Sequence, residues 1–182
     1  MLDLSLHILD IAENSTRAGA KTVFITITED LPADRLAIEI IDDGAGMSEA
    51  ARLRAMDPFY TTKKVRRVGL GLPMLAQAVE KTGGRFSLTS EEDRGTRVAA
   101  EFVRSHVDRQ PLGDVTGVII ILIAGNDSVD FVYSHLRDGR LFTLDTRNIR
   151  SAIEDVPISH PDVLRFIRKH VEEGLSEIGA VS

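Results

Sequence analysis

The spacing of apolar and polar residues predicts helices and short strands in alternation along the chain. In the first part of the chain we expect helices over residues 2–18, 48–56 and 73–84 and strands over 21–28, 35–41, 85–90 and 96–103. Ser48 is a suitable N-cap for the second helix. Pro73 suits the first position of the third helix, and Gly83 lies just past its expected end.

The pattern changes after Val103. Residues 104–114 have the polarity, proline and glycine of a connector, and they are followed by expected helices over 115–124, 146–154 and 161–178 and expected strands over 129–136 and 140–146. The last two strands flank Asp138 and Gly139, which is a hairpin signal. We therefore expect an α+β fold: a two-layer α/β sandwich over 1–103, with helices on one face of a mixed sheet, plus a small α/β extension over 104–182.

Composition narrows the classes of function. The chain has 182 residues, a net charge of −6 and no cysteine, so it offers neither a broad basic surface for nucleic acid nor a thiolate metal site. Its most apolar run, "VTGVIIILIAG", is about half the roughly 20 residues that span a bilayer. These features predict a soluble cytoplasmic protein without nucleic-acid binding or membrane insertion.

A polar stripe runs along the first expected helix. Residues spaced four, three, four and three apart place five polar side chains on one face: Asp3, His7, Asp10, Asn14 and Arg17. The other positions are mostly Leu, Ile and Ala. A stripe this narrow suggests that the helix lines a wet cavity, since unpaired charges are costly to bury. The alternative is an ordinary amphipathic helix whose stripe faces solvent.

The segment "DDGAGM" follows the second expected strand. It places Asp42 at the end of that strand, and Gly44 and Gly46 would allow positive φ angles and a close approach of the backbone to a planar ligand. An Asp-Gly pair is also a common tight turn, so this motif alone is a weak signal.

A third motif, "DPFYTTKKVRRVGLGLPM", combines glycines with basic residues. Gly69 and Gly71 come directly before a helix, where free backbone N–H groups and the helix dipole favour an anion. Positive charge is supplied just upstream by Lys63, Lys64, Arg66 and Arg67. A polyphosphate would suit this arrangement, whereas the alternative is a solvated loop.

These motifs follow one another along a single chain, which independent coincidences would rarely produce. Their joint occurrence therefore favours a functional role for them. The chain resembles the GHKL or Bergerat-fold ATPases, which include histidine kinases, anti-sigma-factor serine kinases, gyrase B, heat-shock chaperones and DNA mismatch-repair ATPases. "DIAENSTRAGA" resembles their N box, "DDGAGM" the G1 box, "DPFYTTK" the F box of histidine kinases and "GLGLPM" the G2 box. The resemblance covers roughly residues 4–103.

This resemblance implies ATP and Mg²⁺ as cofactors. Asn14 matches the asparagine whose amide oxygen is a ligand of Mg²⁺, a hard ion that prefers oxygen ligands and keeps several waters. Asp42 matches the carboxylate that accepts a hydrogen bond from the adenine amino group. Gly44 and Gly46 match the glycines that flank the base, and Thr96 matches a threonine that binds adenine through water.

Other residues match the part of the family site that contacts the phosphates. Arg17 occupies the place where histidine kinases commonly have a phosphate-contacting lysine. The end of the family's lid, whose backbone amides cradle the phosphates, corresponds to Gly69, Leu70 and Gly71. The remaining nucleotide-binding residues expected from the G1 and F boxes are Met47, Phe59 and Lys63.

Asp10 is the expected catalytic base. It lies one helical turn before Asn14, where the hydrolytic branches and the anti-sigma kinases have a glutamate that activates the attacking water or hydroxyl. Aspartate can act as a base, but it is one methylene shorter, and a misplacement of about 1 Å can cost roughly a hundredfold in rate.

The sequence departs from histidine kinases in four ways. Arg67 and Val68 replace the first glycine and the threonine of the usual G2 box, and the lid between Phe59 and Gly69 is very short. The N box begins almost at Met1, without the dimerisation and phosphoacceptor segment. No histidine is followed directly by Asp or Glu.

These features predict Mg²⁺-dependent transfer of the γ-phosphate to a separate protein, or hydrolysis of ATP. Two alternatives remain open, a non-catalytic ATP-gated switch and an interaction module that binds no nucleotide. Residues 104–182 carry no recognised motif, and docking of a regulatory partner or homodimerisation through them is expected from size and position alone.

Overall fold

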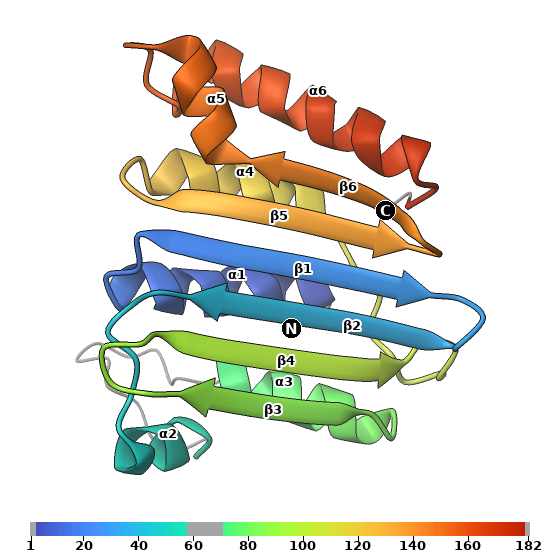
Figure 1. The fold of residues 1–182 in the computed structure, drawn as a ribbon. Helices are drawn as coiled ribbons and strands as arrows, with labels where there is room; N and C mark the ends of the chain where they lie inside the picture. The colour runs from blue at the N-terminus through green and yellow to red at the C-terminus, as the bar shows by residue number, and fades with distance from the viewer. Residues whose placement is uncertain (1–2, 58–70, 181–182) are drawn as a thin grey trace.

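The computed structural model of the chain describes residues 3–57 and 71–180 (Figure 1). Its helices are α1 (Leu4–Arg17), α2 (Glu49–Ala55), α3 (Gly71–Lys81), α4 (Val115–Gly125), α5 (Thr146–Ile153) and α6 (Pro161–Glu177). Its strands are β1 (Thr22–Asp30), β2 (Arg35–Asp42), β3 (Arg85–Ser90), β4 (Thr96–Val103), β5 (Asp130–Arg137) and β6 (Arg140–Asp145).

The elements expected from the sequence are confirmed, although several of their ends differ by one to three residues. Ser48 caps α2 by accepting a hydrogen bond from the Ala51 N–H, and Gly83 follows α3 with a φ of 69°. The start of α3 was placed two residues late, because the helix begins at Gly71 rather than Pro73. Glycine has a low intrinsic helix propensity, which is why Pro73 was the stronger signal in the sequence.

The strands form one mixed sheet in the order β3-β4-β2-β1-β5-β6. The β1–β5 pair is parallel, and the other four neighbouring pairs are antiparallel. The mixed sheet predicted for the fold is thus confirmed, and β5 and β6 of the C-terminal extension prolong it beyond β1. The division at residues 103 and 104 into two functional units stays a prediction.

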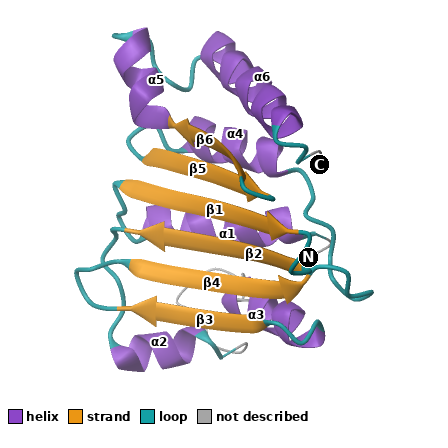
Figure 2. Cartoon of the chain, turned by 45° about the vertical axis from the view of Figure 1, so that its right-hand side comes forward, coloured by secondary structure: helices purple, strands orange, loops and turns teal. Residues whose placement is uncertain are grey.

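Helices α1, α3 and α4 lie against one face of the sheet, as Figures 1 and 2 show. Strand β1 turns Val23, Ile25 and Ile27 toward these helices, and all three side chains are fully buried. Ile8 and Ile11 of α1 join the same core. Burial of each such side chain stabilises the fold by about 1.5–3 kcal/mol, because apolar surface is removed from water. This burial determines which face of the sheet α1 packs against.

Helix α4 contains the apolar run noted in the sequence. It packs between α1 and α6, and its buried residues include Ile119, Leu122 and Ile123. Within residues 3–57 and 71–180, no helix is both long enough and apolar enough to cross a membrane.

The connector after β4 is bound to the start of α1. The Leu4 and Ser5 N–H groups donate to the carbonyls of Pro111 and Leu112 at 2.9 and 2.8 Å, and the Asp3 carboxylate accepts from the Leu6 N–H at 3.1 Å. The first turn of a helix leaves N–H groups without partners inside the helix. Here the connector and the Asp3 cap satisfy them, which fixes the connector against α1.

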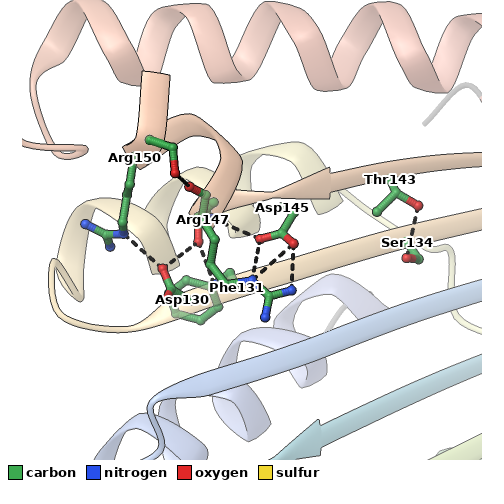
Figure 3. A network of polar contacts seen from close by, with 9 residues as sticks. Asp130, Phe131, Ser134, Thr143, Asp145, Arg147 and Arg150 are labelled. Carbon is green, nitrogen blue, oxygen red and sulfur yellow. Dashed lines mark hydrogen bonds and ion pairs between the residues drawn. The ribbon is translucent and has the colours of Figure 1, made fainter. Parts of the chain in front are cut away.

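Polar contacts hold the start of α5 on β5 (Figure 3). The Phe131 N–H donates to Thr146 Oγ1 at 2.9 Å, and that hydroxyl donates to Asp130 at 3.2 Å. Arg150 Nε donates to the same Asp130 oxygen at 2.9 Å. Asp145 caps the helix by accepting from the Arg147 N–H.

A second polar network joins β1, β5 and Arg104, the first residue after β4. His135 is buried, and its Nε2 lies 3.1 Å from Glu29 Oε1. Its Nδ1 lies 2.7 Å from Tyr133 Oη. Arg137 and Arg104 approach the Glu29 carboxylate at 3.6 and 3.7 Å. The hydrogen bond from His135 and the two guanidinium groups hold the pKa of Glu29 below its ordinary value, against the opposing effect of burial. Burial raises the pKa of Tyr133.

Replacement of Glu29 by Gln should lower the free energy of unfolding at neutral pH by about 1–3 kcal/mol, the scale of hydrogen bonds to charged groups. A carboxyl whose folded pKa is depressed stabilises the protein above its ordinary pKa of 4.5 and loses that contribution as the pH falls through the folded pKa. The difference between wild type and Glu29→Gln should therefore shrink below that value.

Urea unfolding from about pH 7 to about pH 3 measures this difference. Glu101→Gln is the control, because Glu101 pairs with Arg35 at the surface and should change stability by less than about 1 kcal/mol. A difference between wild type and Glu29→Gln that is the same at all pH values would contradict the assigned charge network.

Candidate functional site

A pocket of about 410 Å³ lies where α1, the end of β2, α2 and the start of α3 meet. Polar groups come from Asp10, Asn14, Ser15, Arg17, Asp42 and Thr96. The remaining lining residues are apolar or glycine: Ile11, Ala18, Ile40, Gly46, Met47, Ala51, Ala55, Gly71, Leu72 and Val98. A largely apolar cleft with a few convergent polar groups is typical of small-molecule sites.

The polar stripe of α1 contributes three of these residues. Asp10, Asn14 and Arg17 line the pocket, as expected for residues spaced four and three apart on one helix face. Asp3 and His7 do not line it, so the prediction that the whole stripe faces a wet cavity is wrong at its N-terminal end. Asp3 instead caps the helix.

His7 is buried and does not line the pocket, although its neighbours include Asp10 and the Gly71 backbone, which do. Its side chain is 1% exposed, and Nε2 lies 3.1 Å from Gln110 Oε1 of the connector. Burial lowers the pKa of His7, against the opposing effect of its hydrogen bond to Gln110. Burial costs an uncharged imidazole less free energy than a charged one. This explains how His7 of α1 can be buried against the connector.

The Asp42 carboxylate is held by two donors at the end of β2. It is 7% exposed. Oδ2 accepts from Ser15 Oγ at 2.5 Å, and Oδ1 accepts from the Gly44 N–H at 2.9 Å. A carboxylate has about four lone-pair positions, so it still has acceptor capacity for a ligand N–H. Its orientation is fixed before any ligand arrives.

Close backbone packing surrounds this carboxylate. Gly95 has a φ of 81°, and a Cβ there would lie 1.9 Å from the Asp42 carbonyl oxygen. Gly46 has a φ of 63°, and a Cβ there would lie 1.9 Å from the Glu91 carbonyl oxygen. Both positions require glycine for conformation and for space.

Gly44 differs from the expectation in two respects. It does not have a positive φ and does not line the pocket. A Cβ there would lie 3.1 Å from both the Ala18 carbonyl oxygen and Asp42 Oδ1. Gly44 therefore acts by allowing close packing beside Asp42 and by donating its N–H, rather than by turning the chain.

Thr96 lies opposite Asp42 in the β2–β4 register. Its hydroxyl is 2.8 Å from Ser90 Oγ on the neighbouring strand, and Thr96 lines the pocket. The register of the sheet therefore brings together a carboxylate and a hydroxyl that are far apart in the sequence. This is the pair that the sequence associates with an adenine base.

Asn14 and Arg17 interact across the last turn of α1. Arg17 Nη2 donates to Asn14 Oδ1 at 2.6 Å, and Arg17 Nη1 lies 3.8 Å from Glu13. The Asn14 amide oxygen thus accepts a hydrogen bond from a cationic group. The Asp10 carboxylate lines the same pocket. These are oxygen ligands of the kind that Mg²⁺ prefers.

Within the described residues, no group of three or more His, Cys, Asp and Glu side chains is arranged to hold a metal ion. A metal here would depend on few protein ligands, with waters or a ligand's phosphates completing the shell. That matches the usual binding of Mg²⁺, which keeps several waters. The Asn14 amide oxygen and the Asp10 carboxylate, which line one pocket, fit Mg²⁺ as a partner of a phosphorylated ligand.

Gly71 brings the start of α3 against Asp10. A Cβ at Gly71 would lie 1.8 Å from Asp10 Oδ2, so only glycine leaves room for this carboxylate in its present position. Among the described residues, no hydrogen bond occupies the Asp10 carboxylate. A carboxylate in this state can accept a proton or orient a water.

Several lining residues were not predicted from the sequence. Ile40 and Val98 face inward in strands, and they could have been found from strand alternation. Ala51 and Ala55 come from α2, for which the sequence offered no functional signal. Ser15 directly follows Asn14, but its hydrogen bond to Asp42 needs the three-dimensional structure to be seen.

Other predicted residues lie outside the part of the chain that the structure describes. These are Phe59, Lys63, Gly69 and Leu70. Their assignment to nucleotide binding stays a prediction.

Comparison with known proteins gives a match in agreement with these motifs. Residues 2–106 match the family "Histidine kinase-, DNA gyrase B-, and HSP90-like ATPase". The chain is 40% identical over 74 residues to sporulation kinase E of Bacillus subtilis, covering 41% of this chain and 10% of that protein. It is 39% identical over 69 residues to sensor kinase CckA of Brucella abortus, covering 37% and 7%.

A solved structure supports the fold. The N-terminal domain of a DNA repair protein matches with a TM-score of 0.58 and 17% sequence identity, over 85% of this chain and 58% of that chain. The chain spans 10% and 7% of the length of the two kinases.

The glycine at position 95 provides a test of the pocket's geometry. Gly95→Ala should destabilise the protein by more than the roughly 1–2 kcal/mol of left-handed backbone strain, because its Cβ also meets the Asp42 carbonyl oxygen. Displacement of the backbone at Asp42 should also abolish binding of ATP. Thermal unfolding and titration with ATP measure the two effects.

Gly139→Ala is a matched control. Gly139 also has a φ of 81°, but a Cβ there meets no atom within 4 Å. It should show the strain alone and normal ATP binding. If the two variants have equal stability and equal affinity, the close packing around Asp42 has no role in the site.

Proposed function

Because the chain belongs to the histidine kinase-, DNA gyrase B- and HSP90-like ATPase family, we propose that it binds Mg²⁺-ATP and transfers the γ-phosphate to a separate protein or to water. The observation that carries this proposal is the convergence of α1, the end of β2 and the start of α3 on one pocket, where Asp10, Asn14, Arg17, Asp42 and Gly71 all contribute.

Asp42 accounts for recognition of adenine. Its carboxylate is an acceptor held in place by Ser15 and Gly44, so it can receive the amino group of adenine without reorganisation. Guanine has a carbonyl at the corresponding position and would face a repulsive carboxylate. Ile40 and Val98 provide apolar surface beside this carboxylate for the faces of the base.

Asn14, Arg17 and Gly71 account for the phosphates. The N-terminal end of α3 offers backbone N–H groups and a positive dipole end, and Arg17 supplies a formal positive charge. Bound Mg²⁺ would neutralise charge on the phosphate oxygens, and Asn14 is the residue that would hold it. Phosphoryl transfer depends mainly on such positioning and charge stabilisation.

Asp10 is the proposed base. It lies one turn before Asn14 on α1 and borders the same pocket. The attacking group, a water or a hydroxyl of the acceptor protein, would lose its proton to the Asp10 carboxylate as the bond to phosphorus forms. Gly71 leaves the space that lets the shorter aspartate side chain reach this position.

An ATP-gated switch is the second candidate, and one observation favours it. The first turn of α1 binds the connector through the Leu4 and Ser5 N–H groups, while later turns of the same helix line the pocket. A shift of α1 on nucleotide binding would therefore reach residues 104–182, whether they dock a partner protein or a second copy of the chain.

Asn14→Ala and Asp42→Ala should each weaken binding of Mg²⁺-ATP by roughly tenfold to a hundredfold, because each removes a charge-assisted interaction. Isothermal titration calorimetry measures the affinities. Asp127→Ala is the control, since Asp127 is exposed in the loop before β5. Unchanged affinity in both site variants would refute the assignment of this pocket to ATP.

Asp10→Asn should retain binding of Mg²⁺-ATP and reduce the release or transfer of the γ-phosphate by roughly a hundredfold or more, the scale of general base catalysis. The measurement is incubation with γ-labelled ATP, with and without cell extract, followed by separation of labelled proteins and free phosphate. Asp127→Asn is the control.

This experiment also separates the candidate functions. Label on another protein supports a kinase, and free labelled phosphate supports a hydrolase. Binding without any loss of label supports the switch. Turnover that persists at the wild-type rate in Asp10→Asn would remove Asp10 from the mechanism.

A further inference from the structure

The Asn14 amide oxygen is occupied by a cation that belongs to the protein itself. Arg17 Nη2 donates to Asn14 Oδ1 at 2.6 Å, which is a short distance for such a bond. Arg17 also lies 3.8 Å from Glu13. The guanidinium group therefore contacts the oxygen that the proposed function assigns to Mg²⁺.

The two cations compete for this position. An amide oxygen can accept from two directions, but a guanidinium and a divalent ion on one oxygen would lie only a few ångströms apart and repel each other strongly. The Glu13 carboxylate lies 3.8 Å from the guanidinium, and both groups are about half exposed, so this surface pair offsets little of that repulsion. Direct binding of Mg²⁺ to Asn14 therefore favours departure of Arg17.

We propose that Arg17 and Mg²⁺ alternate on the Asn14 oxygen, so that Arg17 takes the place of the metal's positive charge in the metal-free site. This inference rests on the proposed binding of ATP. When ATP arrives without the metal, Arg17 supplies the cation for the phosphates. When Mg²⁺-ATP binds, Arg17 leaves the Asn14 oxygen, which would then hold the metal, and turns toward the phosphates in the same pocket.

The local structure allows this movement. The Arg17 side chain is 48% exposed, and Arg17 is the last residue of α1. Its pairing with Glu13 joins two half-exposed groups, and such surface pairs hold a side chain weakly. Arg17 also lines the pocket, so its guanidinium has phosphate-binding space within reach of its present position.

This alternation has a measurable thermodynamic consequence. Loss of Arg17 should weaken the binding of ATP more in the absence of Mg²⁺ than in its presence. With Mg²⁺ present, the metal replaces the missing charge and does not have to displace Arg17 from Asn14. The factor by which Mg²⁺ raises ATP affinity should therefore be larger in Arg17→Gln than in wild type, by roughly fivefold or more for a coupling of ordinary strength.

The experiment is calorimetric titration of the full chain with ATP, once with excess Mg²⁺ and once with EDTA. Wild type, Arg17→Gln and Arg168→Gln are compared. Arg168 on α6 is a matched control, because it also forms an i,i+4 pair with a glutamate at 3.8 Å and has a similar exposure of 44%. The control variant removes the same charge far from the pocket.

A larger Mg²⁺ factor in Arg17→Gln, with wild-type behaviour in Arg168→Gln, supports the alternation. Binding by Arg17→Gln that is detected only with Mg²⁺ supports it as well. Equal Mg²⁺ factors in wild type and Arg17→Gln would overturn it, as would failure of Arg17→Gln to bind ATP even with Mg²⁺. If wild type binds ATP under neither condition, the proposed function itself fails.

Discussion

The Asp42 carboxylate, buried at the end of β2, connects the sheet to α1 and organises the pocket around it. Burial of a charged group is costly unless hydrogen bonds replace the lost water. Ser15 and Gly44 supply these bonds at 2.5 and 2.9 Å. Because Ser15 belongs to α1, the same interaction sets the position of Asn14 beside it and of Asp10 one turn earlier.

The C-terminal extension continues this framework. Strand β5 pairs in parallel with β1, α4 packs against α1, and the connector holds the first turn of α1 through Leu4 and Ser5. Helix α1, which carries the proposed base and metal ligand, is therefore hydrogen-bonded to the extension at its N-terminal end. Under the proposed switch, this contact is the route by which nucleotide binding would reach residues 104–182.

Much of this fold could be predicted from the sequence, because local signals and packing agree. Strand alternation in β1 and the Ser48 cap of α2 identified their elements. The parallel pairing of β5 with β1 was not predicted, since no local pattern encodes which strands become neighbours. The start of α3 was misplaced because Gly71 was read as part of a loop, whereas its contact with Asp10 depends on tertiary structure.

The site was predicted less completely. Asp10, Asn14, Arg17 and Asp42 share a pocket as the motifs implied, because helical spacing and a strand end fix their directions. His7 belongs to the same polar stripe but does not line the pocket. Its ring nitrogen instead contacts Gln110 of the connector, 103 residues away in the sequence. Neither this contact nor the Ser15 bond to Asp42 has a signature in the local sequence.

We propose that one cleft uses a fixed carboxylate to select an adenine nucleotide. Calorimetric comparison of Mg²⁺-ATP with Mg²⁺-GTP tests it most directly. We expect ATP to bind and GTP to bind at least about a hundredfold more weakly, because a site built for a hydrogen bond rejects a base that cannot make it. Equal affinities for the two nucleotides would contradict it.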